Sequence, residues 1–240
     1  MRFIRKQSWL LLCCLMFVHN SYTQNNNSEN LYSWFDNQVG SEDISLNNGL
    51  IHYNTYRTGD KNNFRYYKNE FLKGNVTYDN QKFYNVDLKY DLFTDALLYQ
   101  PEGSAYSINL IKEKVSNFYI DGKHFVNLSL EKNSPEFVSG YYEENVVSER
   151  FIFYIKYIKK IREKIKENTS LSEFRTEDTY LLYYKNNYTN VTSKKDVILI
   201  FPEYKSKIND FYLMNKKLAK SDTSQFMKNL FAYINQISIK

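Results

Sequence analysis

The side chains that most often carry out chemistry in proteins are scarce in this 240-residue chain. It has three histidines and two cysteines, and beyond residue 24 only His52 and His124 remain. A zinc site needs three or four converging ligands, and cysteine–histidine catalysis needs a thiol. Both histidines lie among apolar residues in expected strands, so a structural role is favoured over metal binding. The sequence predicts no metal site and no cofactor.

Motifs of nucleophilic and phosphate chemistry are absent too. The chain has no Gly-x-Ser-x-Gly elbow, and its seven glycines are too widely spaced for a phosphate-binding loop. Carboxylates remain, with Asp87 and Asp91 on one expected strand and Asp95 just beyond it. Four strand residues span about 13 Å, whereas glycosidases place two carboxylates roughly 5–9.5 Å apart. We predict no catalytic residue; a carboxylate-dependent hydrolase with an acid from another strand is a further alternative.

Aromatic side chains are the other candidates for binding, because the chain holds 23 tyrosines and 17 phenylalanines. Tyrosine rings on an exposed sheet face can stack on a sugar or contact a partner protein. The candidate ligand-binding residues are Tyr78, Tyr84, Tyr90, Tyr141 and Tyr142. The opposing interpretation is that most of these rings fill the core, and that the residue usage reflects an AT-rich genome.

The first 24 residues have the pattern of a secretory signal peptide. Arg2, Arg5 and Lys6 precede an apolar run at 9–18 that is short for a membrane span, and small or polar residues follow it. Its removal takes away both cysteines and lowers the formal net charge from +5 to about +2. The apolar surroundings of the cysteines argue against a lipid anchor. We expect an exported protein of the periplasm or outer cell envelope, without a transmembrane helix in its mature form.

The basic charge does not indicate a nucleic-acid partner. The one basic cluster, at 156–166, is interrupted by Glu163 and followed by Glu167. A nucleic-acid-binding protein needs a basic face that survives such pairing. A solvated strand or helix face is the better interpretation of this cluster.

Alternating apolar and polar residues predict an antiparallel β domain over residues 49–192. Even-numbered positions from Tyr84 to Leu92 are apolar and odd-numbered ones polar, which is typical of a strand with one face on a core. Residues 76–78 form its expected partner across a turn at 79–82. A third hairpin is expected around residues 185–187.

A second hairpin is expected at Asp121-Gly122, a strong turn dipeptide. A three-residue loop would place five apolar residues on one face, namely Phe118, Ile120, Val126, Leu128 and Leu130. Residues 151–158 fit both a strand and a helix. We favour a strand that leaves the sheet near Lys159 as a basic arm or short helix.

Residues 193–240 are expected to be helical and to pack on the same domain. Ser193 and Asp196 resemble a capping box, Pro202 begins a second helix, and Asp222 caps a third. Residues 25–48 are polar and Asn-rich, and we interpret them as a tether with a short docking segment at 31–35. The expected fold class is α+β, an antiparallel, curved meander sheet with the C-terminal helices packed on one face.

Three stretches of the chain carry a resemblance, namely residues 74–78 with 84–91, residues 181–191, and residues 201–205 followed by 208 and 211–212. Together they resemble a family of uncharacterised exported proteins of Bacteroidetes-type bacteria. The resemblance implies an exported bacterial protein. No activity is assigned to that family, so no functional residue is carried over from it.

These observations favour a non-enzymatic, exported cell-envelope protein, a structural or interaction module whose partner is another envelope protein or a glycan. A periplasmic or surface binding module for a small apolar or glycan ligand is the main alternative. It predicts a closed pocket lined by one face of the sheet, at Val76, Tyr84, Val86, Leu88 and Tyr90.

Overall fold

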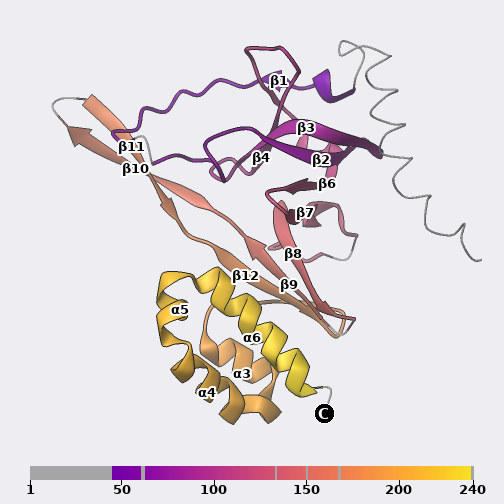
Figure 1. The fold of residues 1–240 in the computed structure, drawn as a ribbon, viewed down its shortest axis with the longest axis vertical. Helices are drawn as coiled ribbons and strands as arrows, with labels where there is room; N and C mark the ends of the chain where they lie inside the picture. The colour runs from indigo at the N-terminus through magenta and orange to yellow at the C-terminus, as the bar shows by residue number, and fades with distance from the viewer. Residues whose placement is uncertain (1–44, 61–62, 133, 150, 167–168, 239–240) are drawn as a thin grey trace, which may run out of the picture. The chain divides into compact units, whose positions relative to one another are not determined.

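One large antiparallel sheet organises the described part of the chain. The computed structural model describes residues 45–60, 63–132, 134–149, 151–166 and 169–238. Eleven strands pair in the order β1-β5-β4-β3-β2-β6-β7-β8-β9-β12-β13 (Figure 1). The strands are β1 (Leu50–Ile51), β2 (Leu72–Tyr78), β3 (Gln81–Asp91), β4 (Ala96–Gln100), β5 (Ile108–Asn109), β6 (Val115–Ile120), β7 (Lys123–Asn127), β8 (Tyr141–Ser148), β9 (Phe151–Lys156), β12 (Thr179–Tyr184) and β13 (Asn187–Asn190).

Two meanders make up this sheet. Strands β2 to β5 form the first, strands β6 to β9 with β12 and β13 form the second, and β2 joins them by pairing with β6. The sheet is open, with the short strands β1 and β13 at its edges. The predicted α+β class, an antiparallel sheet with C-terminal helices, is confirmed.

Three tight turns set the register of the hairpins. Residues 79–80, 121–122 and 185–186 connect β2 to β3, β6 to β7 and β12 to β13, and all of them have φ between 51° and 69°. A two-residue turn of this kind needs positive φ at both positions, which Asn, Asp and Gly tolerate best. The three predicted hairpins are confirmed.

The predicted three-residue loop at Asp121-Gly122 is wrong. Ile120 pairs directly with Lys123, so the turn has two residues and Phe118 lies opposite Phe125. The two phenylalanine rings stack with centroids 4.8 Å apart. Phe125 therefore takes the core position that the sequence pattern assigned to Val126, which is only half-buried.

A bulge at Asn85, which was not predicted, changes the face of the sheet on which the even-numbered side chains of β3 lie. Asn85 has φ of 54°, and the register with β2 shifts between Gly74 and Val76. Such a bulge moves the following side chains to the opposite face. Phe83 is buried as a result and Tyr84 is only half-buried, so the predicted even-numbered core face holds from residue 86 onward.

Aromatic rings fill the core between the two meanders. Tyr90 contacts Phe118, Phe125 and Tyr141 edge to face, with ring centroids 5.4–5.7 Å apart. All four side chains are at most 1 % exposed. Burying one such ring stabilises the fold by about 2 kcal/mol, so the aromatic excess of the sequence serves packing here.

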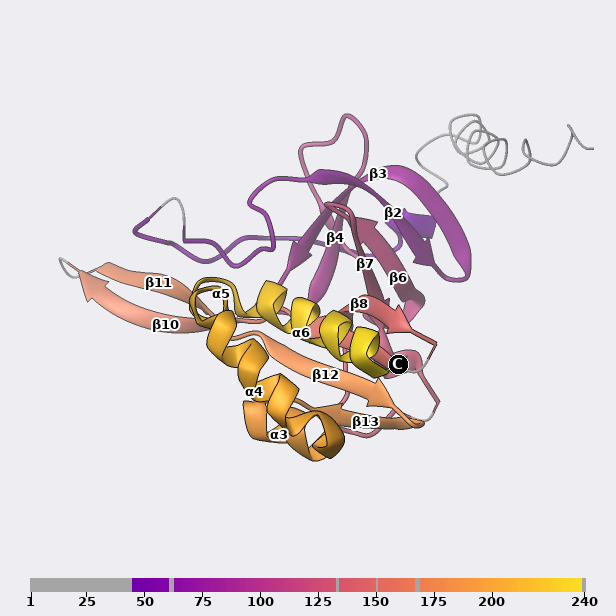
Figure 2. The same cartoon turned by 60° about the horizontal axis from the view of Figure 1, so that its bottom comes forward.

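The C-terminal helices cover one face of β9 and β12 (Figures 1 and 2). Ser193 and Asp196 form the predicted capping box, and Asp222 Oδ1 accepts a hydrogen bond from the backbone of Gln225 at 2.9 Å. Helix α6 buries one side against the sheet, at Phe226, Met227, Leu230, Phe231 and Ile234. The helices are α3 (Lys194–Ile200), α4 (Lys205–Met214), α5 (Lys216–Ser221) and α6 (Thr223–Ser238).

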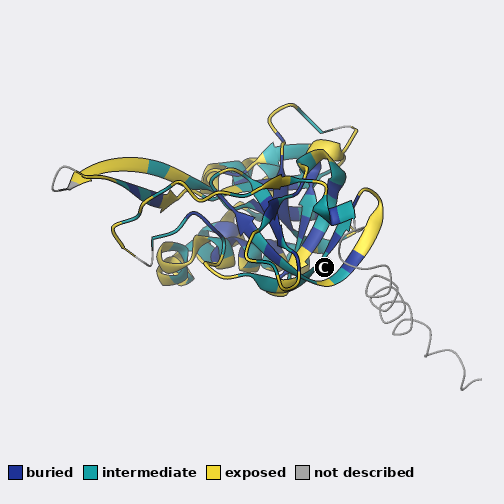
Figure 3. Ribbon diagram, turned by 90° about the horizontal axis from the view of Figure 1, so that it is seen from above, coloured by how far each residue is buried: buried dark blue, intermediate teal, exposed yellow. Residues whose placement is uncertain are grey.

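A separate two-stranded sheet extends from the end of β9. β10 (Lys159–Lys166) pairs in antiparallel fashion with β11 (Thr169–Thr176), and we refer to these two strands as the arm. The predicted basic arm near Lys159 is thus a β-hairpin and not a helix. Its outer part is largely exposed (Figure 3, left). The predicted signal peptide and the docking segment at 31–35 lie outside the described residues.

Candidate functional site

Four of the five candidate tyrosines lie in the core. Tyr78 and Tyr141 are 0 % exposed, Tyr90 1 % and Tyr142 6 %, whereas Tyr84 is half-buried. The Tyr90 hydroxyl donates a hydrogen bond to Asp95 Oδ1 at 2.6 Å. Burial, followed by the Asp95 charge, raises the pKa of Tyr90 well above its usual range. A ligand-binding role for these tyrosines stays a prediction, and their surroundings are those of packed side chains.

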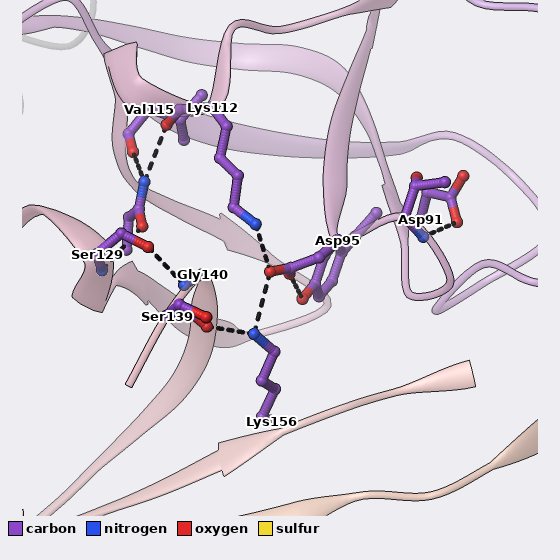
Figure 4. A network of polar contacts seen from close by, with 11 residues as sticks. Asp91, Asp95, Lys112, Val115, Ser129, Ser139, Gly140 and Lys156 are labelled. Carbon is purple, nitrogen blue, oxygen red and sulfur yellow. Dashed lines mark hydrogen bonds and ion pairs between the residues drawn. The ribbon is translucent and has the colours of Figure 1, made fainter. Parts of the chain in front are cut away.

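A half-buried ionic network joins the β3–β4 turn to β9 (Figure 4). Asp95 Oδ2 lies 2.6 Å from Lys112 Nζ and 3.1 Å from Lys156 Nζ. Lys156 also donates to the Ser139 carbonyl. A side chain at Gly140 would overlap the Asp95 carboxylate, because Gly140 packs directly against it with φ of 84°. The network holds together segments that are far apart in the sequence.

The charge state of Asp95 follows from this network. Burial alone would raise the pKa of its carboxyl, but the charges of Lys156 and Lys112 and the hydrogen bonds of Lys112 and Tyr90 together lower it. Asp95 is therefore ionised and paired at neutral pH. A general acid needs a proton to give, so this carboxylate stabilises structure and is unsuited to acid catalysis.

A buried carboxylate, Glu143, connects the sheet to the helices. Glu143 on β8 is 3 % exposed and accepts a hydrogen bond from the Tyr157 hydroxyl at 2.5 Å. Lys228 of α6 contacts its other oxygen, and Lys123 Nζ lies 3.5 Å away. Burial and the bond to Glu143 raise the pKa of Tyr157 far above its usual range. The contacts of Glu143 thus attach α6 to β8.

The other sequence candidates for chemistry are also paired with counter-charges. Asp87 forms an exposed ion pair with Lys73 at 3.0 Å. Asp91 forms a buried pair with Arg65 at 3.0 Å and caps the following turn by accepting two backbone hydrogen bonds. Asp87, Asp91 and Asp95 thus each face a cation, and none faces another of the three.

The two histidines take structural positions. His52 Nε2 lies 2.9 Å from the Arg65 guanidinium, which can only donate, so this nitrogen is an acceptor. Burial and the Arg65 charge lower the pKa of His52. His124 stacks on Tyr119 with ring centroids 4.2 Å apart, and its Nδ1 lies 3.0 Å from Glu144. No group of three or more metal-ligating side chains occurs among the described residues.

The base of the arm is fastened by a loop from the N-terminal half. The Asn63 side chain accepts a hydrogen bond from the Phe174 backbone N–H at 2.6 Å and donates to its carbonyl at 3.0 Å. The Ser172 N–H donates to the Arg57 carbonyl at 2.8 Å. Rings of Tyr56 and Phe93 pack on Phe174 with centroids 5.5–5.6 Å away. The loop thus occupies the outer edge of β11.

Two hollows flank this junction. One, of about 290 Å³, lies over the Arg65 guanidinium, which sits between the rings of Tyr56 and Tyr66 at 4.9 and 5.2 Å. The other, of about 550 Å³, opens along the outer part of the arm and is lined by Asp60, Lys164, Ile165, Leu171 and Glu173, among others. Neither hollow is lined by the residues of the closed pocket that the sequence suggested.

The outer edge of β10 differs from the rest of the sheet. Among the described residues, the backbone of β10 from Lys160 to Ile165 pairs with β11 alone, whereas the outer edge of β11 contacts the loop. Lys160, Arg162 and Lys164 share one face, since alternate residues of a strand point the same way. Lys160 and Lys164 form exposed ion pairs with Glu177 and Glu173, at 2.5 and 2.7 Å.

No family model, no curated protein and no solved structure matches this chain. No helix in the described ranges is long and apolar enough to cross a membrane. The fold alone therefore gives the class of protein. It is an α+β module whose open antiparallel sheet is covered on one side by helices and extended by the arm.

The sequence did not predict the contacts between the base of the arm and the loop. Asn63 lies in a polar loop, and nothing local distinguishes its amide from the many other asparagines of the chain. Arg65 and Asp91 are 26 positions apart, and Phe174 lies 111 positions from Asn63. The available signal was the strand expected to leave the sheet near Lys159 as a basic arm or short helix, and the structure has a β-hairpin there.

Proposed function

We propose that this protein is a non-enzymatic interaction module of the cell envelope, and that the arm is the element that contacts its partner. The observation that carries this proposal is the arm itself. A two-stranded hairpin on its own is only marginally stable in water, yet this one is eight residue pairs long, and its buried residues, Ser172 and Phe174, lie toward its base. Its base is fastened by Asn63 and Phe174, and its outer part carries an Ile165 side chain that is 82 % exposed.

The state of the carboxylates supports a binding role over a catalytic one. Asp91 and Glu143 are buried and Asp95 is half-buried, and each of the three is paired with Arg or Lys. In the hollow of the arm, Glu173 is paired with Lys164, and the hydrogen bond from Lys164 lowers the pKa of Glu173. Catalytic acids have raised pKa values instead. Among the described acids, burial raises the pKa of Asp178, but its carboxylate accepts hydrogen bonds from the Ile158 N–H and the Ser224 hydroxyl, which hold it in a structural role.

Export and the envelope location belong to the same proposal. They are supported by the signal-peptide pattern of residues 1–24. The exposed outer part of the arm suits contacts with other components of the envelope.

An arm-shortened variant tests the proposal. Residues 162–173 are replaced by a two-residue turn, which keeps the fastened pair of Ile161 and Phe174. Proximity labelling in the native envelope should then lose a defined subset of neighbours. Leu199→Ser, at a position that is 79 % exposed on α3, is the matched control and should keep them. Unchanged neighbours for a folded arm-shortened variant would contradict the proposal.

One observation favours a second candidate, a binding module for a small glycan. The hollow of about 290 Å³ is lined by the half-buried ring of Tyr56 and by three asparagines, whereas Arg65 and Tyr66, which also line it, are only 5 % and 6 % exposed. Aromatic faces and planar polar groups are what sugar rings pack against. Titration with envelope glycan fragments should shift the NMR signals of Asn54 and Asn69, which line this hollow, and unmoved signals would remove the candidate.

A further inference from the structure

We infer that the outer edge of β10 binds an extended peptide in which acidic residues alternate with apolar ones, as an added third strand of the arm. This inference rests on the proposed function and names the chemistry of its partner. Strand addition joins backbone hydrogen bonds, which give affinity, with alternate side-chain contacts, which give specificity. Both components are available at this edge.

The backbone component comes from the asymmetry of the arm. The outer edge of β11 is taken by the loop through Arg57 and Asn63, whereas the outer edge of β10 has no backbone partner from Lys160 to Ile165 among the described residues. Each strand residue carries one N–H and one C=O, and every second residue directs both outward. The β10 edge therefore offers a regular row of donors and acceptors to an incoming strand.

The charge component comes from one face of β10. Lys160, Arg162 and Lys164 repeat at intervals of about 6.7 Å, the spacing of alternate strand residues. No ion pair of Arg162 occurs within the described ranges, although Glu173 lies opposite it in the register. Glu173 is instead shared by Lys164 and Arg175. An acid on the added strand would meet Arg162 without displacing any partner.

The exposed ion pairs beside Arg162 do not oppose this arrangement. The side chains of Lys160 and Glu177 are 65 % and 52 % exposed, and those of Lys164 and Glu173 are 56 % and 28 % exposed. Exposed pairs of this kind contribute little and exchange partners readily. Lys160 and Lys164 are thus free to turn toward acids that lie two residues on either side of the one facing Arg162.

The apolar component comes from two isoleucines on the opposite face of the same strand, which lie on either side of the exposed Glu163. Ile161 is half-buried at the base and Ile165 is 82 % exposed near the tip. Side chains of an added strand that alternate with the acids would lie beside these two isoleucines.

Lysines on an edge strand also serve to prevent unwanted pairing, and the two roles make different predictions. A protective edge repels every added strand and gains self-association when its charge is removed. A docking edge accepts the matching strand and rejects a mismatched one. The pattern of the probe therefore decides between the two roles.

The probe is a labelled peptide of about eight residues, a usual strand length, that alternates glutamate and valine. We expect it to bind the purified protein and to slow amide exchange in β10. Arg162→Glu should weaken binding about tenfold. Arg175→Glu is the matched control, because it makes the same charge change on the same face of β11, away from the outer edge, and should change binding less than twofold.

Two further peptides isolate the backbone and the pattern. Methylation of every second amide on the edge-facing side removes the strand donors and should abolish binding. A peptide of the same composition with its acids in one block should bind at least tenfold more weakly. Equal binding of the block or methylated peptide, or no binding of the alternating one, overturns the inference. Preferential binding of anionic vesicles or a soluble polyanion also overturns it.

Failure here and failure of the proposed function can be told apart. If the alternating peptide does not bind but shortening the arm removes native neighbours, the arm remains the contact element and strand addition is wrong. If the peptide binds but shortening the arm changes no labelled neighbours in the envelope, the β10 edge can add a strand and the proposed function is wrong.

Discussion

The side chain of Asn63 pairs with the backbone of Phe174 in both directions. The Phe174 N–H donates to Asn63 Oδ1 at 2.6 Å, and Asn63 Nδ2 donates to the Phe174 carbonyl at 3.0 Å. The Asn63 side-chain amide thus pairs with both backbone groups of Phe174, as the backbone of a neighbouring strand would. Because Phe174 is 4 % exposed, this pairing satisfies backbone groups that water cannot reach.

Asn63→Ala should loosen the arm without unfolding the sheet. The substitution leaves a buried donor unsatisfied, at a cost of about 1–2 kcal/mol. Amide exchange in β11 should accelerate, while exchange in β3 and β6 stays unchanged. Asn69→Ala, at an exposed asparagine nearby, is the control. Equal exchange rates for Asn63→Ala and the wild type would show that the loop does not fasten the arm.

Asp95→Asn should destabilise the whole fold. It leaves Lys156, which is 15 % exposed, without its carboxylate, and a largely buried charge that loses its partner costs about 1–3 kcal/mol. The free energy of unfolding in urea measures this loss. Asp87→Asn breaks a far more exposed pair with Lys73 and should cost less than about 1 kcal/mol. Similar losses for the two variants would contradict the structural role of the Asp95 network.

The same network predicts acid sensitivity. The pKa of Asp95 is lower in the folded protein than its ordinary value of 3.8, because Lys156 and Lys112 outweigh the effect of burial. Its contribution is therefore fully present above about pH 4 and is lost as the pH falls toward the folded pKa. The stability difference between wild type and Asp95→Asn should shrink below pH 4. A difference that stays constant from pH 7 to pH 2 would contradict this account.

Gly140→Ala should be much more damaging than Gly103→Ala. Both glycines have positive φ, 84° and 72°, so each substitution carries a backbone cost of about 1 kcal/mol. A Cβ at position 140 would in addition overlap Asp95, whereas a Cβ at position 103 has nothing within 4 Å. Thermal unfolding of the two variants measures the difference. Equal melting temperatures would show that Gly140 has more space than the structure gives it.

The local parts of this fold could be predicted from the sequence. Turn dipeptides such as Asp121-Gly122 identified the hairpins, because few residues accept positive φ. Helix starts could be predicted as well, because a cap is a hydrogen bond between residues close in sequence. The capping box at Ser193 and Asp196 and the cap at Asp222 are both found in the structure.

Features that depend on distant residues could not be predicted. The bulge at Asn85 reverses the face of Phe83 and Tyr84, yet an asparagine at this position fits an unbroken strand pattern equally well. Lys156 and Asp95 are 61 positions apart, and the alternation of charges along the chain does not say which acid meets which lysine. The second strand of the arm was missed because β11 has no clean apolar alternation.

A photo-crosslinking residue placed at Arg162 tests the central claim most directly. In the native envelope, the account predicts specific adducts from position 162 on the outer edge of β10, and none from Lys195 at the exposed start of α3. Adducts from both positions alike, or from Lys195 alone, would contradict the assignment of the arm as the partner-binding element.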